Sequence, residues 1–144
     1  MKVNCFFLLC LSFLYGCSNN FTKSVGVPPE AGREIVVEPT ENLQRFGDRL
    51  SIGYIEILGD YLAVDVSYSG GCEEHQIDLV TDGKFTATYP PEIELAIVHN
   101  ANQDYCRSMI DEKLYFNLES IRYNGTTRVL MRLNNNNRTY EYNY

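Results

Sequence analysis

Two cysteines and two histidines are the residues of this sequence best suited to chemistry. Cys72 and His75 lie three positions apart, and His99 and Cys106 lie seven positions apart further along the chain. Thiolates and imidazoles bind zinc or copper, paired thiols form disulfides under oxidising conditions, and a histidine can act as a general base. The other three cysteines lie within residues 1–17, and no other histidine is present. The four residues are therefore candidates for a single site.

Alternation along the flanking segments predicts where the histidines point. His75 is in step with Ile77 and Leu79, and His99 is in step with Leu95 and Ile97. Side chains at every second position of a strand share one face. Both histidines are therefore predicted on the apolar face at strand ends, close to each other and to the two cysteines.

Short alternating segments separated by turn residues predict the fold around these residues. We expect an all-β domain over residues 50–144, a single antiparallel β-sandwich or barrel of about eight short strands. Gly59-Asp60, Asp82-Gly83 and Asn124-Gly125 are expected hairpin turns. The expected strands cover residues 50–58, 61–68, 75–81, 84–89, 93–98, 114–118, 127–133 and 139–144.

Residues 1–16 are predicted to be a signal peptide. One lysine is followed by the apolar run Cys5–Leu14, which is too short for a membrane-spanning helix of about 20 residues. After it, Leu14-Tyr15-Gly16-Cys17 resembles the lipobox of bacterial lipoproteins. The resemblance implies cleavage before Cys17 and a lipid anchor, palmitate included, on that residue. Ser18 after the cysteine implies the outer membrane of the cell envelope. Residues 17–49, with several prolines, are predicted to be the lipidated cysteine and a flexible tether.

The fate of Cys72 and Cys106 follows from this processing. They are the only cysteines left once the signal is removed and Cys17 carries lipid, so a Cys72–Cys106 disulfide is the favoured interpretation. It would close a loop of about 34 residues and contribute about 3–4 kcal/mol. The alternative is a zinc or copper site of Cys72, His75, His99 and Cys106, although the spacings are not those of a zinc finger. A site of the two histidines beside an intact disulfide is a weaker variant.

Two further patterns have a structural and a functional interpretation. Asn100, Asn102 and Asp104 alternate as oxygen ligands do in calcium loops, but a plain polar loop is favoured because Tyr105 stands where such a loop needs glycine. Three tyrosines share one face of the last strand, where packing against the core is favoured over an exposed binding stripe. These are Tyr140, Tyr142 and Tyr144.

The run Gly70-Gly71-Cys72-Glu73-Glu74-His75 resembles an element of a group of bacterial lipoproteins of uncharacterised activity. The resemblance covers roughly residues 65–118, including Pro90-Pro91 and the stretch His99–Cys106. It implies envelope placement and no particular reaction.

Charge and motifs narrow the function further. Loss of the signal peptide removes one lysine and takes the formal net charge from −7 to −8, which excludes ordinary nucleic-acid binding. No phosphate loop, nucleophile elbow or paired carboxylates are evident. We expect a non-enzymatic, lipid-anchored envelope protein that binds an unknown protein or small-molecule ligand, without a cofactor. A metal-binding envelope protein is the alternative, and a histidine-based hydrolase is the remaining hypothesis.

Overall fold

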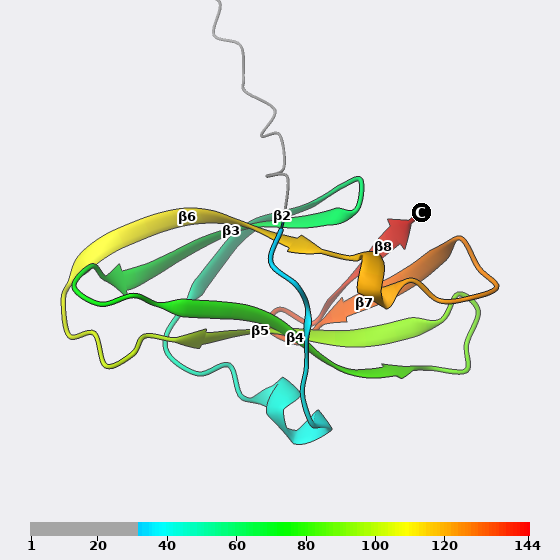
Figure 1. The fold of residues 1–144 in the computed structure, drawn as a ribbon, viewed down its shortest axis with the longest axis horizontal. Coiled ribbons are helices and arrows are strands. Elements are labelled where there is room, and N and C mark those ends of the chain that lie inside the picture. Colours follow the sequence, from blue (N-terminus) through cyan, green and yellow to red (C-terminus); the bar gives the residue numbers. More distant parts are fainter. Residues whose placement is uncertain (1–31) are drawn as a thin grey trace, which may run out of the picture.

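The described part of the chain is a β-sandwich. The computed structural model describes residues 32–144, so the signal peptide, the lipobox and Cys17 lie outside the described residues. A five-stranded and a three-stranded sheet pack on each other, which confirms the sandwich prediction and excludes a closed barrel for these residues (Figure 1). No helix among residues 32–144 is long and apolar enough to span a bilayer.

The three-stranded sheet has the order β2-β3-β6 and is antiparallel. The five-stranded sheet has the order β1-β4-β5-β7-β8. Two short 3-10 helices, η1 and η2, complete the domain. The elements are β1 (Val36–Val37), η1 (Thr40–Gln44), β2 (Ser51–Leu58), β3 (Tyr61–Gly70), β4 (Gln76–Phe85), β5 (Glu92–Asn100), β6 (Ser108–Asn117), η2 (Glu119–Ile121), β7 (Arg128–Leu133) and β8 (Arg138–Asn143).

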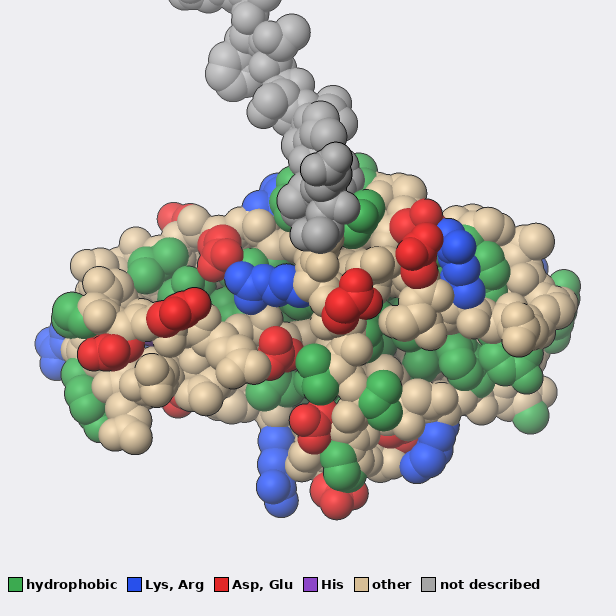
Figure 2. Space-filling view, viewed as in Figure 1, with side chains coloured by type: hydrophobic (Ala, Val, Ile, Leu, Met, Phe, Trp, Pro, Cys, Tyr) green, Lys and Arg blue, Asp and Glu red, His purple; other side chains and the backbone are tan. Residues whose placement is uncertain are grey.

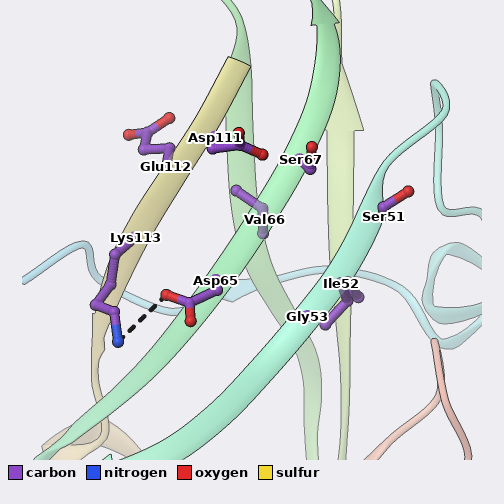
Figure 3. Close-up of a pocket in the computed structure, with 9 residues that line it drawn as sticks. All are labelled: Ser51, Ile52, Gly53, Asp65, Val66, Ser67, Asp111, Glu112 and Lys113. Carbon is purple, nitrogen blue, oxygen red and sulfur yellow. Dashed lines mark ion pairs between the residues drawn. The ribbon is translucent and has the colours of Figure 1, made fainter. Parts of the chain in front are cut away.

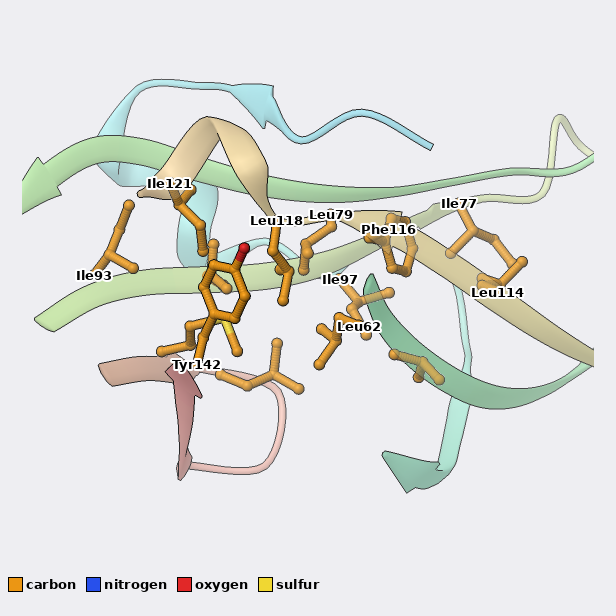
Figure 4. Packing of buried hydrophobic residues seen from close by; sticks show 14 of the residues in the cluster. Leu62, Ile77, Leu79, Ile93, Ile97, Leu114, Phe116, Leu118, Ile121 and Tyr142 are labelled. Atoms are coloured by element: carbon orange, nitrogen blue, oxygen red, sulfur yellow. The ribbon is translucent and has the colours of Figure 1, made fainter. Parts of the chain in front are cut away.

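Alternating apolar residues build the core between the sheets. β3 buries every second side chain from Leu62 to Tyr68, and β5 does the same from Ile93 to His99. Figure 4 shows Leu62 of β3 and Ile93 and Ile97 of β5 among the buried side chains of this cluster, together with Phe116 of β6. Burying one such aliphatic or aromatic side chain contributes about 1.5–3 kcal/mol.

Tyr140 and Tyr142 of β8, and Tyr144 directly after it, pack as expected. Tyr142 is fully buried, and Tyr140 and Tyr144 are half-buried against the core cluster. The Tyr142 hydroxyl donates a hydrogen bond to Asp60 at 2.6 Å, and Asp60 also accepts one from Arg122 at 2.6 Å. Burial, followed by the hydrogen bond to Asp60, raises the pKa of Tyr142 to about 12. This contact ties the β2–β3 turn to β8 of the other sheet.

Three expectations about strand connection and pairing are wrong. Asp82-Gly83 is not a hairpin turn, because β4 continues through it with a register shift between Thr81 and Phe85. Gly83 has φ = +71°, a conformation that serves a bulge as well as a turn. The larger sheet is also mixed, since β1 pairs with β4 and β5 with β7 in parallel. The chain reaches β7 from the other sheet through η2 and the Asn124-Gly125 turn, so those two residues do not close a hairpin.

Residues 33–49 pack on the sandwich, which differs from the expected tether up to residue 49. In Figure 1 the cyan segment crosses the sandwich from the grey trace to η1. The backbone of Arg33 exchanges hydrogen bonds with β6, and β1 adds to the edge of β4. Leu43 in η1 is 1% exposed and packs against Val80 and Ala96. Single apolar residues in an irregular segment create this packing, and they leave no periodic signal in the sequence.

The turn between β7 and β8, together with residues 46–48 of the same segment, bonds the backbone of β5 beyond the end of β7. β7 pairs only with Glu92–Leu95, and the side-chain amide of Asn135 then makes two hydrogen bonds to the backbone of Ile97, at 2.7 and 2.8 Å. Phe46 and Asp48 bond the backbone of His99. The end of β5 that carries His99 is therefore held on both sides.

Candidate functional site

A disulfide joins the two loops that carry the candidate residues. Cys72 and Cys106 are bonded, with their Cα atoms 5.9 Å apart, which confirms the predicted pair. The bond links the loop between β3 and β4 to the loop between β5 and β6. We call the surface formed by residues 71–75 and 101–109 the disulfide end. It lies at the left of Figure 1, where β3 ends and β6 begins.

The buried carboxylate of Asp104 accepts hydrogen bonds from both loops. Its Oδ2 atom accepts hydrogen bonds from the backbone N–H groups of Cys72 (2.8 Å) and Glu73 (3.0 Å) and contacts Nε2 of His75 at 3.2 Å. Its Oδ1 atom accepts from the N–H of Cys106 at 2.7 Å. The side chain is 0% exposed. One buried anion therefore binds both half-cystines and one of the histidines.

These donors fix the charge of the carboxylate. The backbone N–H of Glu73, then those of Cys106 and Cys72, hold the pKa of Asp104 far below its ordinary value of 3.8. Hydrogen bonds to a charged carboxylate favour that charged form, and here they outweigh the opposing effect of burial. Asp104 is an anion at any pH at which the protein is expected to work.

The two histidines are brought together as their alternation predicted. His75 Nδ1 and His99 Nε2 lie 2.8 Å apart, and His99 Nδ1 lies 3.2 Å from the carbonyl oxygen of Arg49. Tyr68 packs on both rings, at centroid distances of 4.7 Å and 5.1 Å. The Tyr68 hydroxyl donates to Glu112 at 3.2 Å, and burial, followed by the charge of Glu112, raises the pKa of Tyr68. The three rings form one buried aromatic stack beside Asp104.

The paired glycines have separate roles. Gly70 carries no Cβ, and a Cβ there would overlap the His75 ring and touch Asp104. Gly71 has φ = +110°, which side chains rarely tolerate, and it turns the chain into the disulfide. The first glycine makes room for the histidine, and the second sets the direction of the loop.

The structure disfavours the four-ligand metal site in the oxidised protein. Cys72 and Cys106 are consumed by their mutual bond, so they offer no thiolate. Two residues of the calcium-like loop already use their side-chain oxygens: both oxygens of Asp104 bind N–H groups, and Asn100 Oδ1 accepts from the Asn102 backbone.

Neither His75 nor His99 has a free ring nitrogen with which to act as a general base. Each of the four ring nitrogens of His75 and His99 already faces a partner within 3.2 Å. Both rings are buried. A histidine that takes a proton from a substrate must lie within hydrogen-bond reach of it. This arrangement suits a structural unit.

Apolar side chains project from the disulfide end. Tyr105 is 86% exposed and Met109 is 72% exposed. The Ser67 hydroxyl donates a hydrogen bond to Sδ of Met109 at 3.3 Å. Figure 2 shows hydrophobic surface at this end beside acidic and basic side chains, and no continuous basic stripe on the face seen. A neighbouring hollow of about 460 Å³ is lined by residues that include Arg49, Ser67, Tyr68, His99, Asp104 and Met109.

A second hollow, of about 410 Å³, is lined by residues of β2, β3 and β6 and by neither histidine (Figure 3). It is lined in part by Asp65, Asp111 and Lys113. Lys113 pairs with Asp65 at 3.2 Å and with Glu56 at 3.3 Å. The charge of Lys113 is therefore already paired with exposed carboxylates, and the disulfide end remains the stronger candidate site.

Sequence reasoning missed three contributors to this site. Asp104 was considered only as a calcium ligand, and neither Tyr68 nor the carbonyl of Arg49 was considered. One local signal for Asp104 exists, since an aspartate often accepts a hydrogen bond from the N–H two residues later, here that of Cys106.

Replacing Asp104 by Asn should flatten the acid dependence of stability. A carboxyl whose pKa is lower in the folded chain stabilises it above the unfolded value and loses that contribution as pH falls. We therefore expect the free energy of unfolding of the native protein to fall between about pH 5 and about pH 2, and to fall less in Asp104→Asn. Urea unfolding across this range measures both slopes. The control is Asp111→Asn, an exposed carboxylate on β6, and an equal slope in Asp104→Asn would contradict the assignment.

Among the solved structures with a similar fold, we describe three. A protein of unknown function from Bacteroides vulgatus has 18% sequence identity and a TM-score of 0.55, and the match covers 78% of this chain and 56% of that chain. A protein described as toxin-related from Parabacteroides distasonis has 22% identity and a TM-score of 0.51, with 78% of this chain and 61% of that chain covered. A NigD-like immunity protein from Bacteroides caccae has 14% identity and a TM-score of 0.56, with 77% of this chain and 58% of that chain covered. Identities this low show the fold alone.

The chain spans less than two thirds of each of these neighbours. No curated protein matches it in sequence. Residues 34–144 match the model of the NigD-like C-terminal β-sandwich domain, which covers both loops of the disulfide end. The chain belongs to the NigD-like β-sandwich family.

Proposed function

We propose that this chain is a lipid-anchored protein of the bacterial outer membrane that binds a partner protein at the disulfide end and is not an enzyme. The lipobox at Leu14–Cys17 supports the anchor. Membership in the NigD-like family and the immunity protein among its structural neighbours are compatible with a protein-binding role.

One observation carries the binding role. At the disulfide end the polar groups of the cluster bind one another, while Tyr105 and Met109 remain exposed. The loop that bears Tyr105 is fixed by the disulfide and by Asp104. A rigid, exposed aromatic side chain loses little conformational freedom on binding, and such residues are typical anchors of protein interfaces. The arrangement therefore favours recognition over reaction.

The surrounding charges suggest what the partner offers. Glu73 and Glu74 are exposed beside the disulfide, and neither forms an ion pair among the described residues. Unpaired rim charges steer partners of opposite sign more than they add affinity. We infer a partner with an apolar pocket for Tyr105 and basic groups around it. A small molecule in the hollow beside His99 is the alternative.

A photoreactive phenylalanine derivative at position 105 should crosslink one envelope protein. Tyr105→Ala combined with Met109→Ala should weaken binding of that protein about 30-fold or more, because a single main anchor of an interface typically contributes at least about 2 kcal/mol. Mass spectrometry identifies the partner, and titration of the purified pair gives the change in Kd. Tyr89 is the matched control, being 80% exposed in the loop at the opposite end of β4 and β5. Equal crosslinking from positions 89 and 105 would argue against this surface.

The proposed lipid anchor at Cys17 can be tested separately from the binding surface. Cys17→Ser should release the protein from membranes into the soluble envelope fraction, because stable attachment needs the acyl chains. Fractionation and intact mass report location and lipidation together. Cys10→Ser, within the predicted signal peptide, should leave both unchanged. Unaltered membrane association of Cys17→Ser would refute the anchor without bearing on the binding surface.

A further inference from the structure

The hydrogen bonds of the buried cluster fix two of its ring protons. The carbonyl oxygen of Arg49 can only accept, so Nδ1 of His99, 3.2 Å away, carries a proton. Asp104 is ionised and also can only accept, so Nε2 of His75, at 3.2 Å, carries a second proton. In a neutral imidazole the other nitrogen is then an acceptor.

The third contact requires one proton more. Nδ1 of His75 and Nε2 of His99 lie 2.8 Å apart. If both rings were neutral, two lone pairs would face each other at this distance inside the protein. A hydrogen bond needs a proton on one of the two nitrogens. Three contacts therefore need three protons, whereas two neutral imidazoles carry only two.

We propose that His75 and His99 share this third proton, so that Asp104 and the two rings form a hydrogen-bonded unit that closes the disulfide end. The positive charge of the ring pair balances the negative charge of Asp104. Burial of a charge is costly unless it is paired and hydrogen-bonded, and here each condition is met. The site is thus a binding site for a single proton, and it stands whether or not the proposed partner binds.

Other charged groups surround the unit without replacing the proton. On β3 and β6, Tyr68 stacks on the rings and donates to Glu112, which also pairs with Arg33 at 3.3 Å. On the segment before β2, Asp48 accepts a hydrogen bond from the Ala101 backbone through its side chain. In the loop before β4, Glu74 is exposed. Among the described residues, neither ring has an acidic partner other than Asp104 within hydrogen-bond distance.

A metal ion between the rings fits the distance less well. Zinc–nitrogen bonds of about 2.0–2.1 Å in a tetrahedral site place two ligand nitrogens roughly 3.3 Å apart. The observed 2.8 Å between His75 Nδ1 and His99 Nε2 is the length of a hydrogen bond. A bound metal is therefore an outcome that would overturn the proposal.

Loss of the proton has a structural consequence. His75 belongs to the same short loop as Cys72, and His99 belongs to β5. Without the proton the two nitrogens repel, and the His75 ring must turn away from either His99 or Asp104. Either change removes one contact between the β3–β4 loop and the rest of the cluster, while the Asp104 hydrogen bonds to Cys72 and Glu73 remain, so a rise in pH should loosen the disulfide end.

Nuclear magnetic resonance of the purified protein with 15N-labelled histidine counts the ring protons directly. We expect three protonated ring nitrogens at the acid end of a titration from about pH 5 to about pH 9. One proton should couple to both His75 Nδ1 and His99 Nε2, and it should disappear as pH rises. Two ring protons at every pH, or a stoichiometric metal ion by elemental analysis, would overturn the proposal.

Reduction of the disulfide by a phosphine measures this loosening. In the native protein we expect the rate to rise about tenfold or more over the same pH interval in which the shared proton is lost. His75→Phe keeps an aromatic ring against Tyr68 but cannot hold the proton, so its disulfide should be reduced rapidly at all pH values. Asp48→Asn is the control and should behave as the native protein does. Equal rates in the native protein and His75→Phe would show that the proton does not hold the loop.

Discussion

The buried carboxylate of Asp104 is the interaction on which the disulfide end depends. It accepts three backbone N–H groups and faces His75, so it binds residues from two loops more than thirty positions apart in sequence. A charged acceptor makes stronger hydrogen bonds than a neutral one, and leaving such a charge unpaired inside a protein is costly. The disulfide and Asp104 therefore secure the same junction by independent means, one covalent and one electrostatic.

The sandwich supplies the frame for this junction. Residues 33–49 run along the edges of both sheets, and Phe46–Asp48 hold the strand end that presents His99. Tyr68 reaches the rings from the opposite sheet. The result is a cluster whose polar groups bind one another, in a junction of two loops from which the aromatic side chain of Tyr105 is exposed. Such a surface is suited to binding, because its geometry is set before any partner arrives.

Local periodicity was enough to predict most of the strands and the meeting of the histidines, because strand alternation depends only on neighbouring residues. The cysteine pair followed from counting the cysteines that remain after the expected processing. Predictions from local periodicity were wrong or absent where contacts between distant parts of the chain determine the structure. Gly83 was read as part of a turn, although a bulge uses the same backbone conformation. Leu43 lies in an irregular segment without a repeating pattern, and Asp104 acts on N–H groups 31 and 32 residues away. No window along the chain contains both partners of such contacts.

Amide hydrogen exchange tests most directly whether Asp104 joins the two loops. The backbone N–H groups of Cys72, Glu73 and Cys106 all donate to this one carboxylate, whereas that of Ala101 donates to Asp48. We predict that the three amides are protected in the native protein and exchange together, about tenfold or more faster, in Asp104→Asn, while Ala101 is unchanged. Fast exchange of the three amides in the native protein, or unchanged exchange in the variant, would contradict this account.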